Sequence, residues 1–112
     1  MASGDIDMGG KISLVGFSEL DGASLDIVRK VVGAFAERVS RQDRMFEGLK
    51  VTLKELHKRD KGEIYEVHAH LFEQGHKFNS ISTERNLFVA LDDALKNVAK
   101  EAEHAMGKMM RK

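Results

Sequence analysis

Residues 83–112 constrain the fold most, because their apolar side chains recur mostly at steps of three and four residues. At about 100° per residue, such steps place these side chains on one stripe, which has to face a core. The stripe contains Leu87, Leu91, Ala94, Leu95, Val98, Ala102, Ala105 and Met109. Basic side chains follow the other side, at Lys96, Lys100, His104, Lys108 and Arg111. The sequence therefore predicts a long C-terminal helix with a buried apolar face and a basic ridge facing solvent.

A second amphipathic helix is predicted to begin near residue 25 and to end near residue 41. Ser24 is a suitable N-cap for it, because its hydroxyl can accept a hydrogen bond from the first helical turn. The apolar positions have helical spacing and are Leu25, Val28, Val32, Phe35 and Val39. Lys30, Arg38 and Arg41 project to the far side, so this helix also has a basic back.

Four stretches have the β-branched or alternating pattern of strands. They are residues 11–17, 49–53, 65–71 and 76–82, with turn signals at Asp60-Lys61-Gly62 and Gln74-Gly75. The order β-α-β-β-β-α predicts an α+β fold, in which a four-stranded sheet carries two helices packed on one face and leaves its other face open. We expect residues 1–10 to be a disordered leader or a cloning remnant, and residues 11–112 to form a single domain.

Composition excludes several classes of protein. The chain has 112 residues, no cysteine, and 18 basic against 18 acidic side chains. A disulfide framework and thiolate chemistry are excluded, and overall charge gives no reason to expect nucleic acid as a partner, so that case depends on where the cations lie. No apolar run approaches the roughly 20 residues of a transmembrane helix. We therefore expect no membrane partner and a cytoplasmic location.

Enzymatic chemistry has little support in the sequence. The chain contains no Gly-x-Ser-x-Gly, no P-loop and no Gly-x-Gly-x-x-Gly motif. Asp92 and Asp93 are adjacent on a helix and about 100° apart, so they do not face each other as a catalytic pair would. Asp92 is better placed to pair with Lys96, four residues on. We expect a protein that is not an enzyme and that needs no cofactor.

Histidines are the only hint of site chemistry, and they alternate along one predicted strand. The face that they share contains Glu66, His68, His70 and Phe72. With His57 or His76 from across a hairpin, His68 and His70 could hold a metal ion, although no third ligand stands at a characteristic spacing. An exposed polar position on an open sheet face is the stronger explanation of these histidines, and a pH-sensitive contact to a partner is a third interpretation.

The order of elements and the second half of the chain resemble the family of ribosome hibernation-promoting factors and ribosome-associated translation inhibitors. The match is best over residues 65–108, which are similar to the family's third strand, glycine turn, fourth strand and final helix. The helix start is Asn86-Leu87-Phe88, and the step that follows is Ala90-Leu91-Asp92. The family's basic positions fall on Lys100 and Lys108 in this helix, with His104 where lysine is common, and on Arg29, Arg38 and Arg41 in the first helix. Phe35 and Asn97 stand where basic residues are usual in the family, and Phe17 lies near another such position.

This resemblance implies a domain similar to double-stranded-RNA-binding domains, lying in the mRNA and tRNA channel of the small ribosomal subunit. There it would block initiation and protect idle ribosomes during stress, either as a short form without the family's dimerising domain or as a relative that recruits another partner to pair ribosomes. Its partners would be small-subunit rRNA and ribosomal proteins. The predicted RNA-binding residues are Arg29, Lys30, Arg38, Arg41, Lys96, Lys100, His104, Lys108 and Arg111.

Two alternatives remain open from the residues themselves. A basic row on the outside of an amphipathic helix can simply be solvated, because mixed charged surfaces are common on helices of soluble proteins. The chain could instead be a protein-interaction or homo-oligomerising module that uses the open sheet face around Glu66, His68, His70 and Phe72.

Overall fold

The computed structural model describes residues 5–58 and 62–110, and only the backbone of residues 57, 58 and 106–110. It has an α+β fold with two helices and a five-stranded mixed sheet. Its elements are β1 (Ile6–Gly9), β2 (Ile12–Val15), α1 (Gly22–Gln42), β3 (Phe46–Lys58), β4 (Gly62–Glu73), β5 (His76–Glu84) and α2 (Leu87–Met110).

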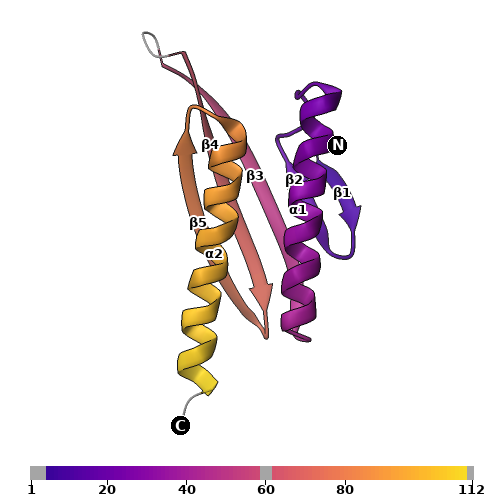
Figure 1. Cartoon of the computed structure of the whole chain (residues 1–112), viewed down its shortest axis with the longest axis vertical. Helices are drawn as coiled ribbons and strands as arrows, with labels where there is room; N and C mark the ends of the chain where they lie inside the picture. Colours follow the sequence, from indigo (N-terminus) through magenta and orange to yellow (C-terminus); the bar gives the residue numbers. More distant parts are fainter. Residues whose placement is uncertain (1–4, 59–61, 111–112) are drawn as a thin grey trace.

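The strands lie in the order β1-β2-β3-β4-β5. All neighbouring pairs are antiparallel except β2 and β3, which run parallel because α1 forms the crossover between them. Both helices cover the same face of the sheet, with α1 over the β2 end and α2 over β4 and β5 (Figure 1). The prediction that the helices share one face is confirmed, and the other face is left open.

The prediction of four strands is wrong, because residues expected in a disordered leader form the fifth. Ile6 pairs with Leu14 and Asp7 pairs with Ser13. Met8 reaches α1, since its Cε atom lies 3.7 Å from the position that a Cβ would take at Gly33. The expectation for residues 1–10 therefore fails over residues 5–10, while residues 1–4 lie outside the described part of the chain.

The hydrophobic core lies between the helices and the sheet. From α2 it receives the predicted apolar stripe as far as Ala102, while Ala105 is half-buried and the Met109 side chain is outside the described part. From α1 it receives Val28, Val32, Phe35, Ala36 and Val39. The sheet contributes Leu14, Leu49, Val51, Leu53, Val67, Ala69 and Leu71. Burial of this apolar surface is what holds both helices against the sheet.

Both helices begin at a polar side chain that caps them, and neither cap was predicted from the sequence. The Asp21 carboxylate accepts a hydrogen bond from the Ser24 N–H at 3.0 Å, so α1 begins before Ser24 instead of at it. The Asn86 Oδ1 atom accepts from the N–H groups of Phe88 and Val89, at 2.8 and 3.1 Å. Because Asn86 caps the helix, α2 starts at Leu87 and not at residue 83. Residues 83 and 84 belong to the end of β5.

A glycine permits the chain to leave β2 close to β3. Gly16 has a φ of 83°, and a Cβ at this position would lie 2.3 Å from the Leu53 carbonyl oxygen. Only glycine fits such a contact, because its backbone is free to adopt positive φ and it has no side chain to clash. The next residue, Phe17, is fully buried in the core.

No helix within the described residues is long and apolar enough to cross a membrane.

Candidate functional site

The basic residues of α1 are all exposed, but they do not form one row. Arg29 and Arg38 are nine residues apart, which at about 100° per residue places them roughly 180° apart on the helix. Lys30 and Arg41 are eleven residues apart and therefore share nearly the same direction, away from the core. The structure thus presents a solvent-facing pair, Lys30 and Arg41, with one arginine on each flank.

Two of these arginines have contacts within the helix. The Arg41 Nη2 atom lies 3.0 Å from the Glu37 Oε2 atom in an exposed ion pair. The Arg38 guanidinium lies 5.6 Å from the centroid of the Phe35 ring. Exposed pairs of this kind are weak, so they leave both arginines able to exchange their present contact for a phosphate.

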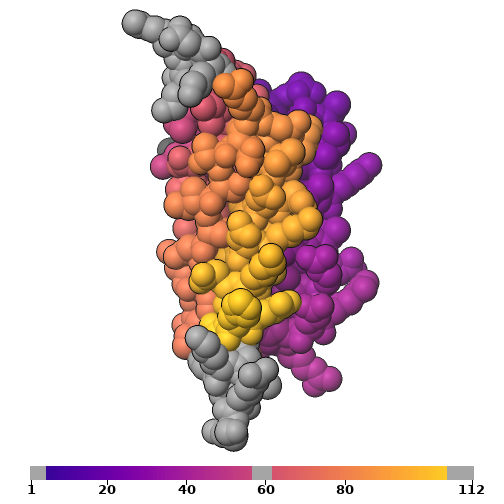
Figure 2. All heavy atoms as spheres, turned by 60° about the vertical axis from the view of Figure 1, so that its left-hand side comes forward, coloured from indigo at the N-terminus to yellow at the C-terminus, as the bar shows by residue number. Residues whose placement is uncertain are grey.

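The predicted row of basic side chains on α2 is present, but acidic side chains lie between its members. Lys96, Lys100 and His104 are exposed at steps of four, so each is about 40° round from the last. The Lys96 Nζ atom lies 2.9 Å from the Asp92 Oδ2 atom, which confirms the predicted pair. The Lys108 side chain and Arg111 lie outside the described part of the chain. Figure 2 shows α2 running along the molecule beside α1, so the two helices lie next to each other on the helix-covered side of the sheet.

The helices differ in charge. The sequence of α1 contains four basic and two acidic side chains, whereas α2 contains three lysines and four acidic side chains. Phe35, at a position where the family resemblance leads one to expect a basic residue, and Phe17, near another such position, are core residues here. The excess of positive charge on the helical face therefore lies on α1.

The open sheet face holds the second predicted site. His68 lies beside Ile81 on β5, and His70 lies between Lys50 on β3 and Asn79 on β5. The His68 Nε2 atom is 2.6 Å from the Glu66 Oε2 atom, and this hydrogen bond is the main reason that the pKa of Glu66 is lowered. The four residues predicted as a partner face do lie on one strand face, where the two imidazole rings stack with centroids 6.4 Å apart.

The histidines already have hydrogen-bond partners within this face. The His70 Nδ1 atom lies 2.6 Å from the Asn79 Oδ1 atom, and His68 is held by Glu66. Within the described residues, no group of three or more histidine, cysteine, aspartate or glutamate side chains is arranged to hold a metal ion. The metal interpretation of His68 and His70 therefore has no third ligand in this part of the chain, and the side chain of His57, one of the two predicted candidates, lies outside it.

No family model matches the chain, and no curated protein matches it.

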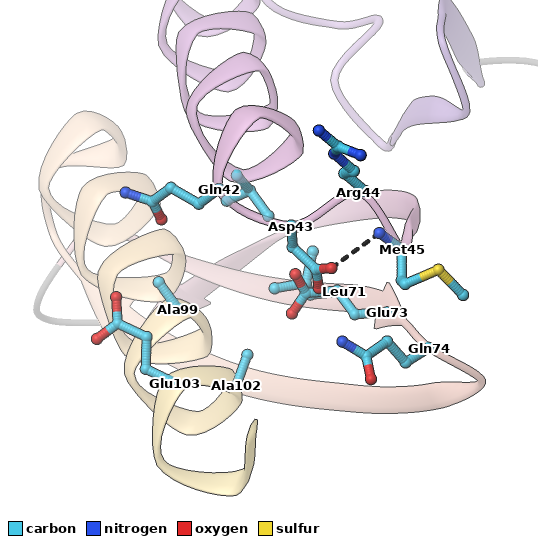
Figure 3. Close-up of a pocket in the computed structure, with 11 residues that line it drawn as sticks. Gln42, Asp43, Arg44, Met45, Leu71, Glu73, Gln74, Ala99, Ala102 and Glu103 are labelled. Atoms are coloured by element: carbon cyan, nitrogen blue, oxygen red, sulfur yellow. Dashed lines mark hydrogen bonds between the residues drawn. The ribbon is translucent and has the colours of Figure 1, made fainter. Parts of the chain in front are cut away.

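Sequence reasoning missed a pocket at the end of the sheet, where α1 ends beside the second half of α2 (Figure 3). The pocket has a volume of about 290 Å³. Its apolar walls come from Val39, Met45, Leu71, Ala99 and Ala102. Its polar groups come from Gln42, Asp43, Arg44, Glu73, Gln74 and Glu103.

A pair of carboxyl groups lines this pocket. Glu73 ends β4 and is 4% exposed, and burial followed by the neighbouring Asp43 raises its pKa to about 7. Asp43 is the C-cap of α1, and its Oδ1 atom accepts a hydrogen bond from the Met45 N–H at 2.8 Å. The pKa of Asp43 is lowered, mainly because the Glu73 carboxyl group donates a hydrogen bond to it. The pair therefore shares one proton near neutral pH.

The alternation of buried residues along β4 marks Glu73 as a buried position. Val67, Ala69 and Leu71 alternate along β4 towards the core, and Glu73 is the next residue in that series. A carboxylate at a buried strand position needs a partner. Asp43 supplies it from a segment that the sequence shows only as the connection after α1.

Proposed function

We propose that this protein is a non-enzymatic, cytoplasmic factor that binds rRNA of the small ribosomal subunit and restrains translation on idle ribosomes. The observation that carries the proposal is the excess of exposed positive charge along α1, on the helical side of the sheet. The resemblance of the element order and of residues 65–108 to the hibernation family supports the same assignment.

Phosphate groups are the expected contacts. Lys30 and Arg41 project from the centre of the exposed side of α1, and Arg29 and Arg38 stand on its flanks, so the helix can contact phosphates on both sides of its axis. Lys96 and Lys100 on α2 provide a second, weaker row, because neighbouring acids offset their charge. Such contacts recognise the shape of an RNA duplex more than its base edges.

A charge-reversal pair tests this proposal. Arg29→Glu with Lys30→Glu changes two exposed residues on α1, and Lys50→Glu with Lys77→Glu makes the same change in charge on the open sheet face. Co-sedimentation with isolated small subunits at two salt concentrations is the measurement. With about four phosphate contacts, affinity falls on the order of a hundredfold between ~50 and ~200 mM salt.

The α1 variant should bind much more weakly and with a shallower salt dependence, by roughly one unit of slope for each lost phosphate contact. The sheet variant should bind as the unmodified protein does. Equal binding by all three proteins, or binding that ignores salt, would contradict the proposal.

A second candidate is a protein-interaction or homo-oligomerising module that uses the open sheet face. The observation that favours it is Ile81, an apolar residue that is 59% exposed on this face beside His68. This module would not bind ribosomes. Loss of an oligomer in Ile81→Lys, measured by sedimentation velocity, would support this candidate, as would absence of ribosome binding by the unmodified protein.

A further inference from the structure

The pocket at the end of α1 has the dimensions and walls of a small-ligand site. Its volume of about 290 Å³ is close to the lower end of the range for such sites, roughly 300–1,000 Å³. Apolar side chains from α1, β4 and α2 form its walls, and the polar groups gather where α1 ends. It includes none of the cations proposed above to contact RNA, so the inference drawn from it does not depend on that proposal.

Glu73 is a buried carboxylate for which the described residues provide no N–H or O–H donor except the other carboxyl group. It is 96% buried, and its hydrogen-bond partner is the Asp43 side chain. None of the ion pairs within residues 5–58 and 62–110 includes Asp43 or Glu73. Asp43 also accepts hydrogen bonds from the Met45 N–H and the Gln74 side chain, whereas the only partner of Glu73 among the described residues is Asp43. Two ionised carboxylates can only accept hydrogen bonds, so the contact between them needs either a proton or a cation.

The charged groups around the pair are mostly acidic. Glu103 faces the pocket from α2, and the Glu47 carboxylate of β3 accepts a hydrogen bond from the Gly75 N–H in the turn after β4. Arg44 also lines the pocket, but Figure 3 shows its side chain directed away from the two carboxyl groups. His76 is the residue paired with Glu73 across the β4–β5 hairpin. In addition, α1 ends here, and the carbonyl end of a helix favours cations.

We propose that this pocket binds a small organic ammonium ion, whose charged group replaces the proton between Asp43 and Glu73 and whose alkyl chain lies against the apolar walls. A metal ion is a poorer match, since the described residues contain no group of three or more histidine, cysteine, aspartate or glutamate side chains placed to hold one. Apolar walls beside a carboxyl pair suit a ligand with an alkyl chain and a cationic head.

Binding of such a ligand has a characteristic pH dependence, because the ammonium ion displaces a proton into the buffer. With a Glu73 pKa of about 7, about one tenth of the pair is free of this proton at pH 6 and about nine tenths at pH 8. The affinity should therefore rise about tenfold from pH 6 to pH 8. An alkylammonium ion stays charged across this range, so the change belongs to the protein.

Isothermal titration calorimetry with hexylammonium chloride tests the proposal, in phosphate and in HEPES buffer so that proton release can be measured. 1-Hexanol is the neutral control with a similar chain. We expect saturable binding of the ammonium ion, at least about tenfold weaker binding of the alcohol, and release of about half a proton for each ammonium bound at pH 7.

Two variants and one matched control assign the effect to the pocket. Glu73→Gln keeps the shape of the protonated side chain, and it should weaken binding at pH 8 at least about tenfold and abolish proton release. Ala99→Leu fills part of the pocket and should weaken binding without removing a carboxylate. Glu84→Gln makes the same charge change as Glu73→Gln at the other end of β5 and should change neither quantity. Thermal unfolding of each variant verifies that it is folded.

The proposal is overturned if the unmodified protein shows no saturable binding, or if hexanol binds as tightly as hexylammonium. It is equally overturned if a folded Glu73→Gln protein binds hexylammonium with unchanged affinity.

Discussion

The proton shared by Asp43 and Glu73 should make the stability of the protein fall as pH rises towards and through neutrality. The folded protein holds the Glu73 proton with a pKa of about 7, against an ordinary value of 4.5 for the unfolded chain. The stabilising effect of this proton is fully present below pH 4.5 and is lost as pH rises through 7. The lowered pKa of Asp43 acts in the opposite direction, but only below its ordinary value of 3.8.

The magnitude follows from the difference between these pKa values. At about 1.4 kcal/mol for each tenfold change in proton affinity, the change from 4.5 to about 7 corresponds to about 3 kcal/mol of unfolding free energy. Glu73→Gln cannot ionise, so it avoids this loss. At pH 8 the variant should be more stable than the unmodified protein by up to about 3 kcal/mol, or roughly 10 °C in Tm, and at pH 4.5 the two should be similar.

Urea unfolding followed by circular dichroism between pH 4.5 and pH 8.5 is the assay. Asp43, Glu103 and His76 are present in both proteins, so the difference between their free energies of unfolding isolates the Glu73 proton. Glu84→Gln serves as a control for the change in net charge. A difference between Glu73→Gln and the unmodified protein that stays constant from pH 4.5 to pH 8.5 would refute the reasoning.

Three further predictions test how the fold is held together, and thermal or urea unfolding measures each. Gly16→Ala should cost more than about 2 kcal/mol, because the new Cβ meets the Leu53 carbonyl oxygen at a backbone conformation that suits glycine. Asn86→Ala should cost about 1 kcal/mol by removing the cap of α2. Ile6→Asp with Met8→Asp should cost on the order of 1–3 kcal/mol, because β1 packs against the core, whereas the same change in a disordered leader would cost nothing.

The helices could be predicted from the sequence because their stripes depend only on local spacing. Leu91 and Val98 on α2, like Val28 and Val32 on α1, are fully buried, as the helical period requires. The order of the last five elements follows for the same reason. Local spacing does not specify caps, since Asp21, Ser24 and Asn86 are all residue types that can cap a helix, and the three-dimensional course of the chain decides which of them does.

The first strand could not be predicted with the same security because it is short. Ile6–Gly9 contains two apolar residues and gains its stability from β2 and α1, which are brought to it by the fold.

The carboxyl pair was missed for a related reason. Asp43 and Glu73 are thirty positions apart, and only the packing of the end of α1 against the end of β4 makes them neighbours. Local pattern therefore predicts elements better than it predicts sites built between them.

The balance of charge in the whole chain conceals an uneven distribution on the helices. Eighteen basic and eighteen acidic side chains cancel, yet α1 has two more basic than acidic residues, while α2 has one more acidic residue than lysines. Because ions screen exposed charges over about 10 Å at ~0.1 M salt, an RNA backbone near α1 responds mainly to the cations of that helix. An anionic partner should therefore approach the molecule with α1 leading, and the acids of α2 should favour an orientation in which α2 lies farther from phosphate.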